Sequence, residues 1–378
     1  MFRFWWQLPG PARFVSNVVT NLREGKNVVL CVPEFVPDGL RTAIRTGVEA
    51  IGSFHWTTMP VSDYPSDRPA DMLFRRFVPA APADTIRSAD NLAHESSFFG
   101  KIIWLENIAD VDWPRWKEFL TDYAHVCRSH GELERSVFCT LLVGSVAKDI
   151  PRDDVCLVRC YWRDMISRLD MLLFAYHCLQ ERRLGRLDRE LVVHIVANLA
   201  GWDPRLALDL SSAQPCDILR PLPLLRELAR KRGWLFCSND LDAIDWYRGV
   251  HDTVEGQNFI HTLALVNDDR HCEIDHRVWR AEVAVMLPFV EERRRELLGH
   301  LRGVLKLPHK TQTGEIIDNL LDLEIGHICH QLAVNRSRNH ESVRRTAQKL
   351  RDIRNALSHL EPLQPQKALD PDLQSPFG

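Results

Sequence analysis

Three side chains near the end of the chain combine the groups that phosphate chemistry requires. The stretch RNALSH contains Arg354, Asn355 and His359. A guanidinium binds two phosphate oxygens through parallel N–H bonds and stays charged at any working pH. An imidazole titrates nearest to neutral pH and can accept or donate a proton. An amide can orient either partner, so these residue types are suited to proton transfer beside a bound phosphate.

A helix is expected to carry these three residues. Apolar residues recur at three- and four-residue spacing along this stretch: Leu350, Ile353, Leu357 and Leu360. Such spacing predicts an amphipathic helix, which Pro362 then stops. Asn355 and His359 are four apart and share one face of that helix, with Arg354 next to it.

Structural roles would also explain two of these residues. Arg354 could form a surface ion pair with Asp352 or Glu361, which contributes little to stability. His359 could be a C-terminal cap that interacts with the helix dipole. The residues alone leave both alternatives open.

The C-terminal region resembles a HEPN domain over about residues 270–362. RNALSH fits the R-x4-6-H motif of that family, and amphipathic helices are expected at 276–305, 313–335 and 341–360. The resemblance implies a helical bundle, and many such domains are metal-independent ribonucleases. It implies a homodimer that brings Arg354 and His359 of both copies together, with Asn355 following by its motif position and Glu324 at the acidic position. A HEPN fold retained for binding alone is a further alternative.

The chemistry that this resemblance implies needs neither a metal nor a cofactor. RNA carries its own nucleophile, the 2′-OH, and cleavage requires removal of one proton, protonation of the leaving oxygen and stabilisation of a phosphorane. His359 can move a proton and Arg354 can hold the phosphate oxygens. Two facing copies would supply both an acid and a base.

The first 160 residues alternate between apolar runs of strand length and helical stretches. The runs occupy residues 27–33, 101–107, 136–145 and 153–162, with a weaker candidate at 54–62. Continuous apolar runs are typical of strands buried on both faces of a parallel sheet. The alternation predicts a doubly wound, mainly parallel α/β domain of about five strands.

This order of elements resembles a P-loop ATPase of the AAA or STAND kind over roughly residues 1–260. KIIWLEN looks like the acidic strand of that family, with Glu106 and Asn107 at its end, and the helices after Trp162 look like its lid. However, VPEFVPDGLRTA follows the first strand and lacks the glycine cradle and lysine of a phosphate loop. We therefore expect no ATP hydrolysis, and Glu106 is either a solvated strand end or the remnant of an ancestral acid.

Net charge, arginine clusters, cysteine spacing and apolar runs limit the other functions that the chain can have. The formal net charge is -3, so binding of a polyanion has to come from a local patch. Arginines gather at residues 292–296 and 336–345, where they form either a solvated helix face or a groove for an RNA backbone. Ten cysteines without a C-x-x-C pair favour reduced thiols. No apolar run reaches 18 residues and no signal peptide is evident, so we expect a cytoplasmic protein without membrane contact.

A metal site is not expected. Histidines and cysteines do gather in two stretches, RHCEIDH and HICH, with these members: His271, Cys272, His276, His327, Cys329 and His330. They lack the paired spacings of zinc sites. His327 and His330 are instead expected at the bundle interior or beside the cleft of Arg354.

These observations predict a three-part chain. The expected parts are an α/β domain at 1–163, a helical lid and linker at 164–265, and a HEPN-like bundle with a short proline-rich tail at 266–378. The predicted function is a HEPN-type endoribonuclease effector of a toxin or antiphage defence system, with RNA and protein partners and a pseudo-ATPase sensor or scaffold. One alternative is a non-catalytic scaffold or regulatory subunit of a larger complex. A second alternative is a nucleotide-binding STAND-like NTPase.

Overall fold

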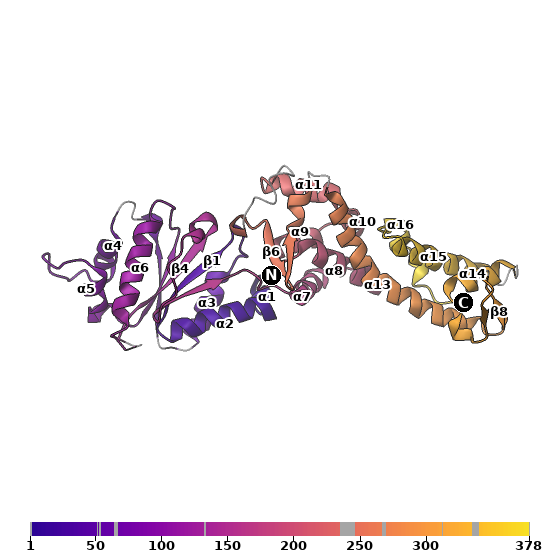
Figure 1. Ribbon diagram of the computed structural model, residues 1–378, viewed down its shortest axis with the longest axis horizontal. Helices are drawn as coiled ribbons and strands as arrows, with labels where there is room; N and C mark the ends of the chain where they lie inside the picture. The colour runs from indigo at the N-terminus through magenta and orange to yellow at the C-terminus, as the bar shows by residue number, and fades with distance from the viewer. Residues whose placement is uncertain are drawn as a thin grey trace. The chain divides into compact units, whose positions relative to one another are not determined.

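The computed structural model divides the chain into two compact units. One comprises Met1–Asp170 and Asn239–His261, and the other Met171–Ser238 and Thr262–Gly378 (Figure 1). The structure describes residues 2–50, 52, 54–63, 67–131, 134–234, 246–266, 270–311, 313–334 and 340–377. Each unit is considered by itself below, and the three-part division expected from the sequence stays a prediction.

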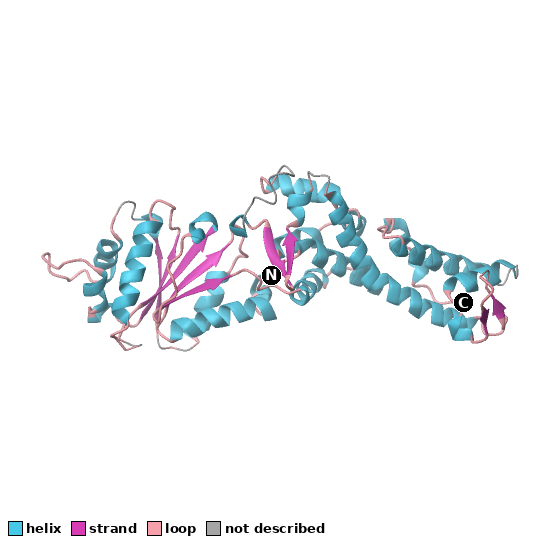
Figure 2. Cartoon of the chain, viewed as in Figure 1, coloured by secondary structure: helices cyan, strands magenta, loops and turns pink. Residues whose placement is uncertain are grey.

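A five-stranded parallel sheet forms the centre of the first unit (Figure 2). Its strands are β1 (Asn27–Val32), β2 (His55–Pro60), β3 (Lys101–Glu106), β4 (Val137–Val143) and β5 (Leu157–Tyr161). Their spatial order is β2-β3-β4-β1-β5, and every pairing is parallel. All six residues of β1 are buried, as its continuous apolar run predicts. The predicted mixed α/β class and parallel sheet are therefore confirmed.

Two groups of helices cover the sheet, on opposite sides in Figure 1. One group is α2 (Pro9–Arg23) and α3 (Leu40–Glu49), which contact each other. The other is α4 (Pro69–Phe77), α5 (Ala89–Ala93) and α6 (Trp113–Cys127), which also pack together. Val29, Ile103 and Phe138 join the second group in one buried core. The connection from β1 to β2 crosses the sheet in one direction, and the connections from β2 to β3, β3 to β4 and β4 to β5 cross it in the other. Because such connections are right-handed, the two directions place helices on both faces of the sheet.

Smaller elements complete the first unit. They are helix α1 (Phe2–Trp5), the 3-10 turns η1 (Val61–Asp63), η2 (Ser96–Phe98), η3 (Gly144–Lys148) and η4 (Trp246–Arg248), and the hairpin β6 (His251–Val254) with β7 (Gln257–Ile260). The buried Asp170 carboxylate accepts the backbone N–H of Gly10 at 3.0 Å. A negative group is stabilising at the N-terminus of a helix, so this bond fixes the start of α2.

The described residues of the second unit are helical, apart from one small hairpin. Its elements are α7 (Arg168–Leu179, which begins in the first unit), α8 (Arg186–Ala200), α9 (Pro204–Ser211), α10 (Pro215–Leu219), α11 (Leu222–Lys231), η5 (Thr262–Leu265), α13 (His271–His300), β8 (His309–Lys310), β9 (Ile316–Ile317), η6 (Leu320–Asp322), α14 (Ile325–Val334), α15 (Glu341–Ser358), α16 (Pro365–Ala368) and η8 (Pro371–Leu373). Helix α13 packs against α8 and α15, and α14 packs against α15. In the part of the chain that the structure describes, none of the helices has the length and apolarity needed to cross a bilayer.

The prediction of a helix at 313–335 is wrong for the first half of that range. Residues 316–317 instead pair with 309–310 in the hairpin, and α14 begins only at Ile325. Gly314 has a φ of +90°, a conformation that a helix cannot contain. The chain therefore forms a turn at Gly314, although the spacing of its apolar residues predicted a helix. The shorter helix places Glu324 at the N-terminus of α14.

The residues after α15 pack against the bundle. Leu363 is 1% exposed and donates its backbone N–H to the carboxyl group of Glu282 at 2.9 Å. Lys349 pairs with Asp370 at 2.6 Å, and the Arg293 guanidinium lies 3.9 Å from the ring centroid of Phe377. These contacts anchor the end of the chain to α13 and α15.

The buried carboxyl group of Glu282 makes the stability of this packing depend on pH. Burial raises the pKa of its carboxyl group from 4.5 to about 8, against the opposing effects of the Leu363 N–H and Arg220. The folded state therefore favours the protonated form. The stabilising contribution of that form is complete below the ordinary pKa of 4.5 and is lost as pH rises towards about 8.

We expect Glu282→Gln to flatten the pH dependence of stability, because glutamine is neutral at every pH and keeps an acceptor for Leu363. Between about pH 5 and about pH 9 the free energy of unfolding should fall less in the variant than in the wild type. Urea unfolding at the two pH values measures this, with exposed Glu361→Gln as the control. Equal falls in the wild type and Glu282→Gln would contradict the assignment.

Candidate functional site

The C-terminal end of α15 presents the predicted motif to solvent. Leu350, Ile353 and Leu357 are each at most 1% exposed and hold one face of the helix in the bundle. Arg354, Asn355 and His359 lie on the remaining surface and are exposed. The helix carries Arg354 and Asn355 and ends directly before His359, close to the end that its apolar spacing predicts.

His359 is the C-cap residue of α15. Leu360 follows in the left-handed conformation, with φ 61°. Its N–H bonds the Leu357 carbonyl at 3.3 Å, and the Glu361 N–H bonds the Ala356 carbonyl at 3.2 Å. This pair of bonds is a Schellman motif, which closes the helix. The cap geometry fixes the backbone of His359 while its side chain is exposed.

Two residues of α13 hold the chain on either side of His359. The Trp279 indole N–H donates to the Leu357 carbonyl at 2.8 Å, and the Glu282 carboxyl accepts the Leu363 N–H at 2.9 Å. The exposed His276 ring stacks on Trp279 with centroids 5.1 Å apart. Sequence reasoning missed these contacts, because no local pattern shows which carbonyl an indole will reach.

Arg354 and Glu324 are brought together. The Arg354 Nη2 atom lies 3.4 Å from a Glu324 carboxylate oxygen, with side chains 45% and 64% exposed. An exposed pair at this distance contributes little to stability, so the guanidinium can exchange the carboxylate for another anion. Asp352, the ion-pair partner considered from the sequence, bonds Arg351 instead, at 3.1 Å.

Within one chain, Arg354 and His359 point in different directions. A separation of five residues corresponds to about 140° around a helix axis. Among the described residues no hydrogen bond or ion pair joins the Arg354 side chain to that of His359 or Asn355. The described contacts therefore do not bring the guanidinium and the imidazole together within one chain.

One imidazole bonds Glu324, and two further imidazoles cluster with that ring. The Glu324 backbone N–H donates to Nδ1 of His327 at 3.1 Å. The His309 ring centroid is 5.3 Å from that of His327 and 6.1 Å from that of His330. Burial, followed by the charges of His327 and His330, lowers the pKa of His309. The sequence singled out His327 and His330 but not His309, which reaches them only through the hairpin.

The described residues contain no group of three histidine, cysteine, aspartate or glutamate side chains arranged to hold a metal ion. His309, His327 and His330 carry side chains that can transfer protons. Imidazoles are suited to that role near neutral pH.

Several arginines of the two basic runs bind the protein itself. Arg293 is 7% exposed and donates to the Ser375 carbonyl at 2.5 Å. Arg294 donates to the carbonyls of Leu321 and Leu323, each at 2.9 Å. Residues 336–339 of the second run lie outside the described residues.

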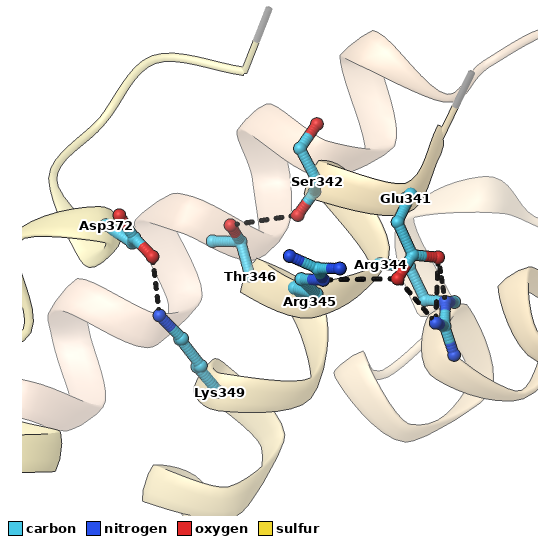
Figure 3. Close-up of polar contacts among 7 residues, drawn as sticks. All are labelled: Glu341, Ser342, Arg344, Arg345, Thr346, Lys349 and Asp372. Atoms are coloured by element: carbon cyan, nitrogen blue, oxygen red, sulfur yellow. Dashed lines mark hydrogen bonds and ion pairs between the residues drawn. The ribbon is translucent and has the colours of Figure 1, made fainter. Parts of the chain in front are cut away.

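The N-terminal half of α15 shows the same pattern (Figure 3). Arg344 and Arg345 both bond Glu341, at 2.8 Å and 3.1 Å, and Lys349 bonds Asp372 at 2.6 Å. These cations are neutralised by carboxylates of the same unit. The positive charge expected for an RNA groove is therefore reduced along this part of the helix.

In the first unit, Glu106 is engaged by two donors. Arg41 Nη1 and Trp104 Nε1 each lie 2.7 Å from one of its carboxylate oxygens. Asn107 follows in the left-handed conformation, with φ 59°. Glu106 is therefore an ion-paired strand end, with its side chain 18% exposed.

Protein covers the carboxyl end of β1, where a doubly wound sheet usually binds its ligand. The Glu34 N–H bonds the Tyr247 carbonyl at 3.0 Å, and the Glu34 carboxylate lies 3.4 Å from Arg248 Nε. A Cβ at Gly144 would lie 2.9 Å from the Glu34 side chain. The acidic Glu34 would repel the phosphates of a nucleotide at this position.

No protein-family model matches the chain, and no curated protein matches it significantly. The assignments of the C-terminal bundle to HEPN domains and of the sheet to AAA or STAND ATPases therefore stay predictions. The geometry above has to support a function by itself.

We expect the chain not to hydrolyse ATP, because Glu34 and its partners occupy the carboxyl end of β1. Phosphate release with Mg²⁺ should match the background, and Glu106→Gln should leave it unchanged. Calorimetry with ATP should detect no binding. A Mg²⁺-dependent turnover that Glu106→Gln abolishes would refute this prediction.

Proposed function

We propose that the chain is a metal-independent endoribonuclease of the HEPN kind, with its first unit as a pseudo-ATPase scaffold or sensor. The observation that carries the proposal is the end of α15. There, among the described residues, the Arg354 side chain is held by an exposed 3.4 Å contact with Glu324, while the backbone around His359 is fixed by bonds to α13. A weakly held phosphate binder and an imidazole on a fixed backbone are groups that RNA cleavage can use.

The residues act on a bound RNA strand as follows. Arg354 exchanges Glu324 for the scissile phosphate and binds its oxygens with two N–H groups. Its charge stabilises the phosphorane, in which negative charge accumulates. His359 moves a proton at the reacting oxygens, and Asn355 orients the phosphate.

A two-fold dimer through the C-terminal bundle completes the site. Because Arg354 and His359 diverge on one helix, the arginine of one copy works with the histidine of the other. Two-fold symmetry supplies each contact twice in a self-complementary interface.

We place this activity in the cytoplasm, as an effector in a toxin or antiphage defence system with a protein partner. The nine cysteines described by the structure are free thiols, as in a reducing compartment. The covered end of β1 supports a scaffold or sensor role for the first unit.

A non-catalytic docking bundle is the second candidate function. The observation that favours it is the neutralisation of Arg344, Arg345 and Lys349 by carboxylates of the same unit. Such a surface is poorly suited to bind a long RNA backbone. In that case His359 is only a helix cap.

We expect the purified full chain to cleave RNA in EDTA and to leave 2′,3′-cyclic phosphate ends. His359→Ala should lower the rate by about 10²–10⁴-fold, because it removes a proton-transfer group. Arg354→Ala should lose a similar factor, and Arg354→Lys should recover only part of it, because a point charge lacks the bidentate fork. Labelled tRNA and total RNA resolved by electrophoresis provide the measurement.

Arg345→Ala is the matched control, since it removes an exposed arginine of the same helix that bonds Glu341. Its activity should equal that of the wild type. Intact RNA after incubation with the wild-type dimer, with and without its partner, would favour the docking bundle instead.

A further inference from the structure

The imidazole cluster of His309, His327 and His330 lies outside the RNALSH motif and is connected to Arg354 through Glu324. Glu324 joins the two, because its carboxylate contacts Arg354 at 3.4 Å and its N–H bonds His327 at 3.1 Å. His327 accepts that bond through Nδ1, so a neutral ring carries its proton on Nε2. His327 is thereby fixed in position, and its ring faces that of His309.

The strand that carries His309 is attached to α14. The Gln331 side chain bonds both the N–H and the carbonyl of Lys306, at 2.7 Å and 3.1 Å. These two hydrogen bonds hold Lys306, three residues before His309, against the helix that carries His327 and His330. His309 is half-buried, so its ring is positioned yet open to a ligand.

We propose that His309 is the general base of the Arg354 site and takes the proton from the 2′-OH of a bound RNA strand. The inference rests on the proposed ribonuclease function and adds a catalytic residue that the motif does not contain. It gives the two histidines different roles, with the base on the same chain as Arg354 and the acid on the second copy.

The proposed step is balanced without a metal or a co-reactant. The neutral imidazole of His309 accepts the 2′-OH proton as the 2′-oxygen bonds phosphorus. The bond from phosphorus to the 5′-oxygen breaks, and that oxygen takes a proton from the protonated imidazole of the partner's His359. The products are a 2′,3′-cyclic phosphate and a 5′-hydroxyl, and exchange with water restores both rings.

The surroundings of His309 suit a base, which has to be unprotonated before the reaction. Burial and the charges of His327 and His330 on α14 lower its pKa. A second positive ring beside it would cost energy, since like charges disfavour one another. His309 therefore stays neutral at pH values where an isolated imidazole is partly charged.

The test compares His309→Ala with the wild type as full chains, in single-turnover cleavage of labelled RNA in EDTA. The rate should fall by about 10²–10⁴-fold with little change in KM. Added imidazole should restore part of the rate, because it replaces the missing base; a purely structural role would show no such rescue. His300→Ala is the matched control, since its exposed ring lies against Phe377 and outside the cluster.

A second variant, His309→Gln, and a binding assay with a 2′-deoxy substrate analogue distinguish loss of the base from loss of folding. Both variants should bind the analogue as the wild type does. Wild-type cleavage by either variant, or a loss that imidazole does not restore while analogue binding is unchanged, overturns the role of His309. If His359→Ala abolishes cleavage and His309→Ala does not, only this inference fails. If the wild type cleaves no RNA, the proposed function fails as well.

Discussion

Two hydrogen bonds with α13 hold the chain on both sides of the closing turn of α15. Trp279 holds the Leu357 carbonyl and Glu282 holds the Leu363 N–H, so both sides of His359 are fixed to one helix. Each bond contributes only about 1 kcal/mol to stability. Their greater effect is on position, because a catalytic imidazole has to be held within a fraction of an ångström of its productive place.

The acidic side chains of the two units differ in how firmly their cationic partners hold them. In the first unit, Glu106 is engaged by Arg41 and Trp104, and Glu34 lies at the end of β1 where phosphates would approach. In the second, the described contact of the Glu324 carboxylate is an exposed 3.4 Å pair with Arg354. A phosphate can compete for that arginine far more easily than for the covered edge of the sheet. This contrast is why we propose chemistry in the bundle and a scaffold role for the sheet.

The sequence predicted what continuous local patterns encode. Continuous apolar runs located four of the five strands, and the weaker candidate at 54–62 contains the fifth, β2. The apolar spacing of α15 predicted that Arg354, Asn355 and His359 lie outside the buried face of the helix. Sequence reasoning failed where pairing and packing between segments decide the outcome. The pairing of residues 309–310 with 316–317 replaced half of an expected helix, and it also carries His309 to His327. No spacing rule shows that Trp279 will bond a carbonyl 78 residues later.

The central claim is that one site takes Arg354 from one chain and His359 from another. The most direct test mixes the Arg354→Ala and His359→Ala proteins, lets subunits exchange, and measures RNA cleavage in EDTA. Each variant alone should be nearly inactive. The mixture should regain a substantial part of the wild-type rate, because a mixed dimer contains one site with both residues intact. A mixture as inactive as its components, despite demonstrated subunit exchange, would contradict the account.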